Sequence, residues 1–233
     1  MKLTLLDIAK MIDLSAVQAE NDEEHIKTMV YCAKKYHCIA VYALPGWIPI
    51  LKQFLGENNR DIVIGGPVGF PSGGESTSIK VAEAEELIKM GCGELDIVIN
   101  IGKLLSRRYE DVYEDLRAVI MVSDGIPIKV ILECHYLSDE LILNACDIAI
   151  KAGADWIKTG TGWAKTGATL ENISLIKSHV RDSIKIKASG GIKDLSTLLG
   201  MYERGARRFG IGLNSGIGIF EQVEKLPNQL VNI

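Results

Sequence analysis

The sequence lacks the features that mark zinc sites and disulfide-stapled domains. Its five cysteines include no C-x-x-C pair, and its four histidines show neither an HExxH pattern nor any paired spacing. An odd and scattered set of cysteines is typical of small buried thiols in a reducing compartment. We therefore expect no metal site and no disulfide framework.

Long hydrophobic runs and an excess of basic charge are also missing. The N-terminal stretch MKLTLLDIAKMIDLS is interrupted by Asp7 and Lys10, and no later run approaches the length that spans a membrane. A formal net charge of -4 gives no long-range attraction for nucleic acid or anionic lipid. We expect a soluble, cytoplasmic protein whose partner is a small molecule, with no nucleic acid and no membrane.

Short apolar runs alternate with amphipathic segments along the whole chain. The runs are rich in Val and Ile and end in Gly, Ser, Thr, Asn or Pro, which is typical of strands in a parallel sheet covered on both faces. A short first strand is expected at 11–15, and seven clearer ones at 38–44, 61–70, 94–100, 128–134, 155–161, 183–191 and 207–213.

Helix-like stretches lie between these runs. In TSIKVAEAEELIKMG, Thr77 or Ser78 is expected to cap the start and Gly91 the end. In LSDELILNACDIAIKAG, Ser138 is the expected cap and Gly153 the terminator. Strand followed by helix, repeated about every thirty residues, indicates βα units.

Eight βα units close a barrel. A doubly wound open sheet is the alternative, but it usually has fewer strands, and the first strand-to-helix turn here carries no GxGxxG motif. The 233 residues contain no linker, short repeat or low-complexity segment. We predict an α/β fold, a single-domain (β/α)8 TIM barrel over residues 1–233.

Four lysines fall on positions that point into the predicted barrel. Alternate residues of a barrel strand face the interior, and this parity selects Lys129, Lys158, Lys185 and Lys187. Lys129 and Lys185 lie at strand starts, where a long stem reaches water, so we expect solvated or paired ammonium groups there. Lys158 and Lys187 lie toward the C-terminal ends of adjacent strands, where such barrels build their active sites.

Two amines at one barrel mouth have a chemical consequence. The charge of each disfavours protonation of the other and lowers a lysine pKa from about 10.4 toward neutrality. A neutral lysine can attack a carbonyl, as a Schiff-base aldolase requires. Asp96 is inward by the same parity. It either neutralises one lysine or, with a water, relays protons.

The same residues lie in motifs that resemble the 2-deoxyribose-5-phosphate aldolase family over nearly the whole chain. The motifs are IDLS, GPVGFPSGG followed by SIKVAEAEELIKMG, ELDIVINIG, KVILE, AGADWIKTGTGW followed by GATLENI, KASGGIK and GARRFGIG. Each motif alone is weak, but their shared order at the family spacing is specific.

The resemblance implies a role for three residues. The family motif K-T-S-T-G, which holds the Schiff-base lysine, falls on Lys158, and K-x-x-G-G, which holds a second, proton-handling lysine, falls on Lys187. The family aspartate falls on Asp96. The resemblance also implies a class I aldol reaction without metal or other cofactor, on a (β/α)8 barrel in a homodimer or homotetramer.

Two departures from the family pattern bear on phosphate recognition. Gly160 replaces the family serine in KTGTG. The final phosphate motif becomes GIGLNSG, with Gly212 and a short insertion before Asn214 and Ser215. Neither departure touches the lysine chemistry.

A phosphate is expected at the loops after the last two barrel strands and at the start of a following helix. Two glycine clusters there leave backbone N–H groups free, although glycines at sharp corners also serve tight turns alone. The large aromatics Trp47 and Trp163 either line the pocket or pack. The expected substrate-binding and phosphate-binding residues are Thr159, Thr161, Gly190, Gly191, Gly212, Asn214 and Ser215.

We therefore expect a class I aldolase that reversibly cleaves 2-deoxy-D-ribose 5-phosphate to D-glyceraldehyde 3-phosphate and acetaldehyde. One alternative is a related lysine-dependent aldolase or acyl-transfer enzyme for another phosphorylated keto or hydroxy compound. Two others are a phosphate-binding barrel isomerase or synthase without imine chemistry, and a non-catalytic sugar-phosphate binding protein.

Overall fold

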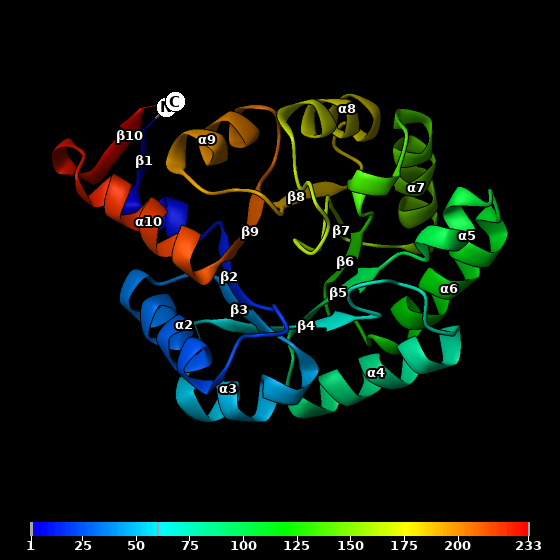
Figure 1. The fold of residues 1–233 in the computed structure, drawn as a ribbon, viewed down its shortest axis with the longest axis horizontal. Helices are drawn as coiled ribbons and strands as arrows, with labels where there is room; N and C mark the ends of the chain where they lie inside the picture. The colour runs from blue at the N-terminus through cyan, green and yellow to red at the C-terminus, as the bar shows by residue number, and fades with distance from the viewer. Residues whose placement is uncertain (1, 60, 233) are drawn as a thin grey trace.

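A computed structural model describes residues 2–59 and 61–232, and its central feature is a closed parallel barrel (Figure 1). The barrel closes where β9 pairs with β2, and this closure excludes the doubly wound open sheet. The predicted single-domain (β/α)8 TIM barrel is confirmed. Its strands are β2 (Ile12–Ala16), β3 (Ala40–Ala43), β4 (Val63–Val68), β5 (Glu94–Val98), β6 (Ile128–Ile131), β7 (Trp156–Lys158), β8 (Lys185–Ser189) and β9 (Arg208–Gly212).

Helices surround the barrel strands (Figure 1). The helices that follow successive strands are α2 (Glu23–Tyr36), α3 (Ile48–Leu55), α4 (Thr77–Met90), α6 (Tyr109–Val122), α7 (Asp139–Ala152), α8 (Leu170–Val180), α9 (Leu195–Glu203) and α10 (Leu213–Glu224). Shorter elements are α1 (Leu5–Ala9), α5 (Ile101–Leu105), and the 3-10 turns η1 (Pro45–Trp47), η2 (Cys134–Tyr136) and η3 (Pro227–Gln229).

A small antiparallel pair of strands lies outside the barrel and was not predicted. β1 (Lys2–Thr4) pairs with β10 (Leu230–Asn232), so segments near the two ends of the chain lie side by side (Figure 1). Leu3 and Val231 are buried there against the core. The predicted domain, 1–233, also includes residues 1, 60 and 233, which lie outside the described residues.

The helix caps agree with the sequence at α7 and differ at α4. Ser138 accepts a hydrogen bond from the backbone N–H of Leu141, and Gly153 ends α7 in the left-handed conformation. The N-cap of α4 is Ser76, so the expectation of Thr77 or Ser78 as cap was wrong. Thr77 is the first residue of α4, and its hydroxyl donates to Asp115 on α6.

The apolar core lies between the strands and the helices, while the barrel interior is polar. Ile157 and Ile186, which alternate with the inward lysines, are buried in this core as parity predicts. The five cysteines are all buried free thiols. Among residues 2–59 and 61–232, no helix is both long and apolar enough to cross a bilayer.

Candidate active site

The barrel interior holds a connected network of buried charged side chains. The network has seven charged side chains from six strands, and the Tyr42 ring from β3 lies among them. Charges removed from water are costly unless they are paired, so their mutual contacts decide which protonation states persist. The charged members are Asp13, Glu94, Asp96, Lys129, Lys158, Lys187 and Arg208.

Lys158 and Lys187 converge as the sequence predicted. They are direct neighbours in the register of β7 and β8. Both Nζ atoms lie 2.7 Å from the same oxygen, Oδ2 of Asp96. Parallel strands place equivalent positions at equal depth, so two lysines of one parity reach the same carboxylate.

Lys158 is the amine that loses its proton most readily. Burial is the largest cause, and it lowers the pKa of Lys158 to about 8. The Asp96 carboxylate opposes this shift, while the charge of Lys187 adds to it. Far more of Lys158 is therefore a neutral nucleophile near neutral pH than of an ordinary lysine, although the protonated form still predominates there.

The pKa of Lys187 does not shift in the direction that the sequence predicted. Burial alone would lower its pKa, but the carboxylates of Asp13 and Asp96, and then Glu94, raise the pKa of Lys187 above its usual value. Asp13 Oδ2 lies 2.6 Å from Nζ of Lys187. The expectation that each amine makes the other easier to deprotonate was wrong for Lys187, because it missed Asp13.

The charges of the network balance when Lys158 is neutral. The three carboxylates are Asp13, Glu94 and Asp96, and the other cations are Lys129, Lys187 and Arg208. A fourth positive charge in this closed interior would be unmatched, which adds to the effect of burial in favouring neutral Lys158.

Asp96 is held as a carboxylate. Burial would raise its pKa, but Lys158, Lys187 and Lys129 hold the pKa of Asp96 well below its usual value. Its other oxygen, Oδ1, lies 2.8 Å from the Tyr42 hydroxyl. A carboxylate of such low pKa is a poor proton acceptor by itself. A proton relay here therefore needs a second group, which is a water or a lysine.

The space beside these groups is small. A central cavity of about 20 Å³ is lined by Lys158, Lys187, Asp13, Tyr42 and Phe70, among others. This volume suits about one water molecule. A water at that position would lie beside Lys158 and Lys187, while Asp96 does not line the cavity.

Four residues of the network were not identified from the sequence: Asp13, Tyr42, Glu94 and Arg208. Arg208 donates from Nε to Asp13 Oδ1 at 2.5 Å and from Nη2 to Glu94 Oε1 at 2.7 Å. The Tyr42 hydroxyl lies 2.8 Å from Glu94 Oε1. Burial, with Asp96 next, raises the pKa of Tyr42 well above its usual value, so its proton is retained. Inward parity within each strand, applied beyond the lysines, would have found all of them.

Of the two lysines expected at strand starts, only one reaches water. Lys185 is exposed, with its ammonium 5.2 Å from the Trp156 ring centroid. Lys129 is fully buried and bonds Glu94 Oε2 at 2.8 Å and the Tyr42 hydroxyl at 2.7 Å. The expectation of a paired ammonium holds for Lys129, but its stem does not lead to solvent.

A second cavity, the glycine-lined cavity of about 150 Å³, lies where phosphate binding was predicted. Gly190 and Gly191 have φ values of 85° and 77°, a conformation that favours glycine. Gly212 is the N-cap of α10, whose free N–H groups and dipole favour an anion. The cavity brings together Thr161, Gly190, Gly191, Gly212 and Ser215, and also Lys193, a cation that was not predicted.

Two predicted substrate residues do not line this cavity. Asn214 lies in the first turn of α10 but its side chain is exposed outside the lining. Thr159 is buried, and its hydroxyl donates to the Ser189 carbonyl and accepts from the Ser189 N–H, both at 3.0 Å. Thr159 therefore ties the end of β7 to β8, and of the two predicted threonines only Thr161 lines the glycine-lined cavity.

The glycine at position 160 has a local reason. A β-carbon at Gly160 would lie 2.8 Å from Oε1 of Glu133. Glu133 is buried and accepts hydrogen bonds at Oε2 from the Thr161 N–H, at 3.1 Å, and from its hydroxyl. The family serine would need this carboxylate to shift.

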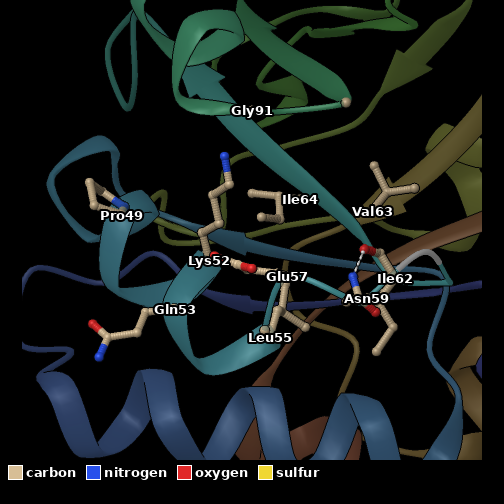
Figure 2. Close-up of a pocket in the computed structure, with 12 residues that line it drawn as sticks. Pro49, Lys52, Gln53, Leu55, Glu57, Asn59, Ile62, Val63, Ile64 and Gly91 are labelled. Carbon is tan, nitrogen blue, oxygen red and sulfur yellow. Dashed lines mark hydrogen bonds between the residues drawn. The ribbon is translucent and has the colours of Figure 1, made fainter.

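A larger cavity lies away from this chemistry, and Figure 2 shows residues that line it. It measures about 610 Å³ and is lined by residues such as Lys52, Ile64 and Gly91. It lies by α3 and the starts of β4 and β5, the end of the barrel opposite to Lys158. Lys52 there donates to the Met90 carbonyl at 3.3 Å, so this cation caps α4.

The comparisons with known proteins agree with the geometry. A model described as the DeoC/LacD family aldolase matches residues 7–222. The chain is 43% identical over 222 residues to deoxyribose-phosphate aldolase from Klebsiella pneumoniae, covering 95% of this chain and 89% of that one. It is 41% identical over 227 residues to the enzyme of that name from Rhizobium meliloti, covering 97% and 91%.

Solved structures show the same likeness. A structure named "QR15, an Aldolase" matches with a TM-score of 0.87 at 39% identity, covering 94% of this chain and 96% of that one. A tetrameric deoxyribose phosphate aldolase from Aeropyrum pernix matches with a TM-score of 0.85 at 26% identity, covering 96% and 94%. With a barrel whose mouth holds two convergent lysines on one aspartate, and a family match over residues 7–222, the chain belongs to the DeoC/LacD aldolase family.

Proposed function

We propose that this aldolase reversibly cleaves 2-deoxy-D-ribose 5-phosphate to D-glyceraldehyde 3-phosphate and acetaldehyde, with Lys158 as the Schiff-base nucleophile. The observation that carries the proposal is the buried Lys158 amine, with a pKa of about 8, on an aspartate that it shares with Lys187. Relatives that bear the name of this activity support the choice of substrate.

The proposed cleavage begins at the aldehyde carbon of the open-chain sugar. Neutral Lys158 adds to that carbon, and uptake of one proton with loss of water gives a protonated imine; the same proton is returned when the last imine is hydrolysed. The hydroxyl on the third carbon loses its proton, the bond between the second and third carbons breaks, and the imine takes up the electron pair as an enamine. Glyceraldehyde 3-phosphate leaves, the enamine carbon gains a proton, and water releases acetaldehyde.

Protons in this scheme move through the group around Asp96. Asp96 stays ionised and acts on a water in the central cavity through the ammonium of Lys187 that it bonds, while Lys187 stays protonated and supplies the fixed positive charge. The mobile proton therefore travels between the substrate, the water and Lys158. This division follows from the opposite pKa directions of the two lysines.

We place the substrate phosphate in the glycine-lined cavity. The free N–H groups at the start of α10, the backbone of Gly190 and Gly191, and the Lys193 ammonium all favour an anion there. Thr161 lines both this cavity and the central one, so one substrate can reach both. Remote phosphate binding would position the reacting carbon and raise turnover as well as affinity.

The assembly and boundaries are also proposed. We infer a homo-oligomer, a dimer or tetramer, which the tetrameric relative from Aeropyrum pernix supports. We also take residues 1–233 as one aldolase domain. The cytoplasmic location stays a prediction from the sequence.

Trapping with borohydride tests the proposed chemistry. Incubation with acetaldehyde and sodium borohydride should reduce the imine and leave an ethyl group on Lys158, read by peptide mass spectrometry. The unaltered protein should also cleave deoxyribose 5-phosphate far faster than deoxyribose. Turnover without an adduct on Lys158 would favour a mechanism without an imine, and an adduct with faster turnover of another sugar phosphate would favour a related aldolase.

The pH dependence of the reaction gives an independent prediction. Because the neutral amine is the reactive form, kcat/KM should rise as the pH increases through about 8, the pKa of Lys158. Lys187→Leu should move this midpoint upward, since it removes a repelling charge and leaves Asp13 and Asp96 to attract the Lys158 proton. Lys185→Leu is the control and should leave the profile unchanged, because Lys185 is exposed. An identical midpoint in Lys187→Leu would contradict the electrostatic coupling.

A further inference from the structure

A third space at the barrel mouth has a different character from the other two. This apolar cavity, of about 450 Å³, is lined by Pro71, Ile101, Leu105, Tyr136 and Trp163, with the buried Glu133 also in its wall. Leu105, Tyr136 and Trp163 are 48%, 53% and 42% exposed, which is high for large apolar side chains. The cavity shares Thr161 with the central cavity, so the two spaces are neighbours.

Trp163 stands between the apolar cavity and the central cavity. Its ring lies edge-on to Phe70, with centroids 5.9 Å apart, and Phe70 lines the central cavity. Its indole N–H donates to the Val17 carbonyl at 2.7 Å, and Val17 also lines the central cavity. Trp163 thus has the apolar cavity on one side and the wall of the central cavity on the other.

The segment that carries Trp163 is firmly anchored. The Thr161 hydroxyl, itself bonded to Glu133, accepts the backbone N–H of Trp163 at 3.0 Å. Gln18 donates to the Gly162 carbonyl at 3.4 Å. The anchors join the loop after β7 to the loop after β2 across the mouth. Trp163 does not itself line the cavity of about 20 Å³ beside Lys158 and contacts its wall through Phe70 and Val17.

We propose that Trp163 is a specificity-determining residue that keeps the apolar cavity separate from the reaction centre, and that the cavity is a latent site for unphosphorylated, apolar aldehydes. This inference rests on the proposed aldolase function. A phosphorylated acceptor is directed to the glycine-lined cavity, where N–H groups and Lys193 face an anion. The apolar cavity offers the reverse, because its walls are largely hydrocarbon and its lining residues include no lysine or arginine to pair with a phosphate.

Removing the indole ring should join the two spaces. Trp163→Ala should raise the ratio of kcat/KM for hexanal to kcat/KM for glyceraldehyde 3-phosphate, with acetaldehyde as donor, by about tenfold or more. Trp163→Phe is the matched control. It keeps a ring against Phe70 but loses the bond to Val17, so the ratio should stay near that of the unaltered protein.

A double variant tests whether the cavity is the site of the gain. Leu105 is half-exposed in the cavity wall, so Leu105→Asp adds a charge there without burying it in the core. Trp163→Ala combined with Leu105→Asp should lose the gain for hexanal and keep the Trp163→Ala rate with glyceraldehyde 3-phosphate. Retention of the gain in the double variant, or an unchanged ratio in Trp163→Ala, would overturn the inference about Trp163.

The unaltered protein separates this inference from the proposed function. If it forms no borohydride adduct on Lys158 and no product with either acceptor, both ideas fail. If it turns over glyceraldehyde 3-phosphate and forms the adduct, while Trp163→Ala leaves the acceptor ratio unchanged, only the role of Trp163 fails.

Discussion

Lys158→Leu should lower kcat for aldol cleavage by roughly 10³-fold or more, because no other side chain in the network combines position with a lowered lysine pKa. The fold should survive. Asp96 keeps Lys187 at 2.7 Å, and the substitution removes a buried amine that is costly to charge. The measurement is steady-state cleavage beside a thermal unfolding curve.

The free energy of unfolding should also depend on pH differently in Lys158→Leu and in the unaltered protein. The folded pKa of Lys158, about 8, lies below the ordinary value of 10.5, so the unfolded chain binds more protons between these values. The unaltered protein therefore gains stability as the pH rises through this window, and Lys158→Leu loses that gain. Lys185→Leu, an exposed lysine on β8, should behave as the unaltered protein in both assays. Near-normal turnover by Lys158→Leu would refute its assignment as nucleophile.

Asp96→Asn should damage both stability and turnover. The central carboxylate holds Lys158 and Lys187 at 2.7 Å, and its loss leaves cations in excess inside a closed barrel. Breaking a buried pair in this way costs about 3–5 kcal/mol. For a chain of this length the loss corresponds to a Tm lower by roughly 6–20 °C. Without the relay, kcat should fall by roughly 10²–10⁴-fold.

A second buried ion pair provides the matched control for Asp96→Asn. Lys80 on α4 and Asp115 on α6 are 2.7 Å apart, and both side chains are buried outside the barrel network. Asp115→Asn should lower the Tm by a similar amount and leave kcat per folded molecule unchanged. A parallel loss of kcat in both variants would indicate that Asp96 acts only through stability.

Much of the architecture was predictable because it depends on local patterns. Strand and helix periods, caps such as Ser138 and Gly153, and the number of βα units specify a closed barrel. The alternation of side chains along a strand then predicted, without tertiary contacts, that Lys158, Lys187 and Asp96 point into the barrel. The pairing of β1 with β10 and the contact of Thr77 with Asp115 were not predicted, because each depends on a partner distant in sequence.

The sequence by itself determined that two lysines and an aspartate meet at one mouth of the barrel, because strand parity and order are properties of the chain. Only the tertiary structure decided which lysine gives up its proton. Asp13 and Glu94 come from strands far from Lys187 in sequence, and their fields raise the Lys187 pKa while burial lowers that of Lys158. A pKa depends on every charge within a few ångströms, so it belongs to the closed barrel as a whole.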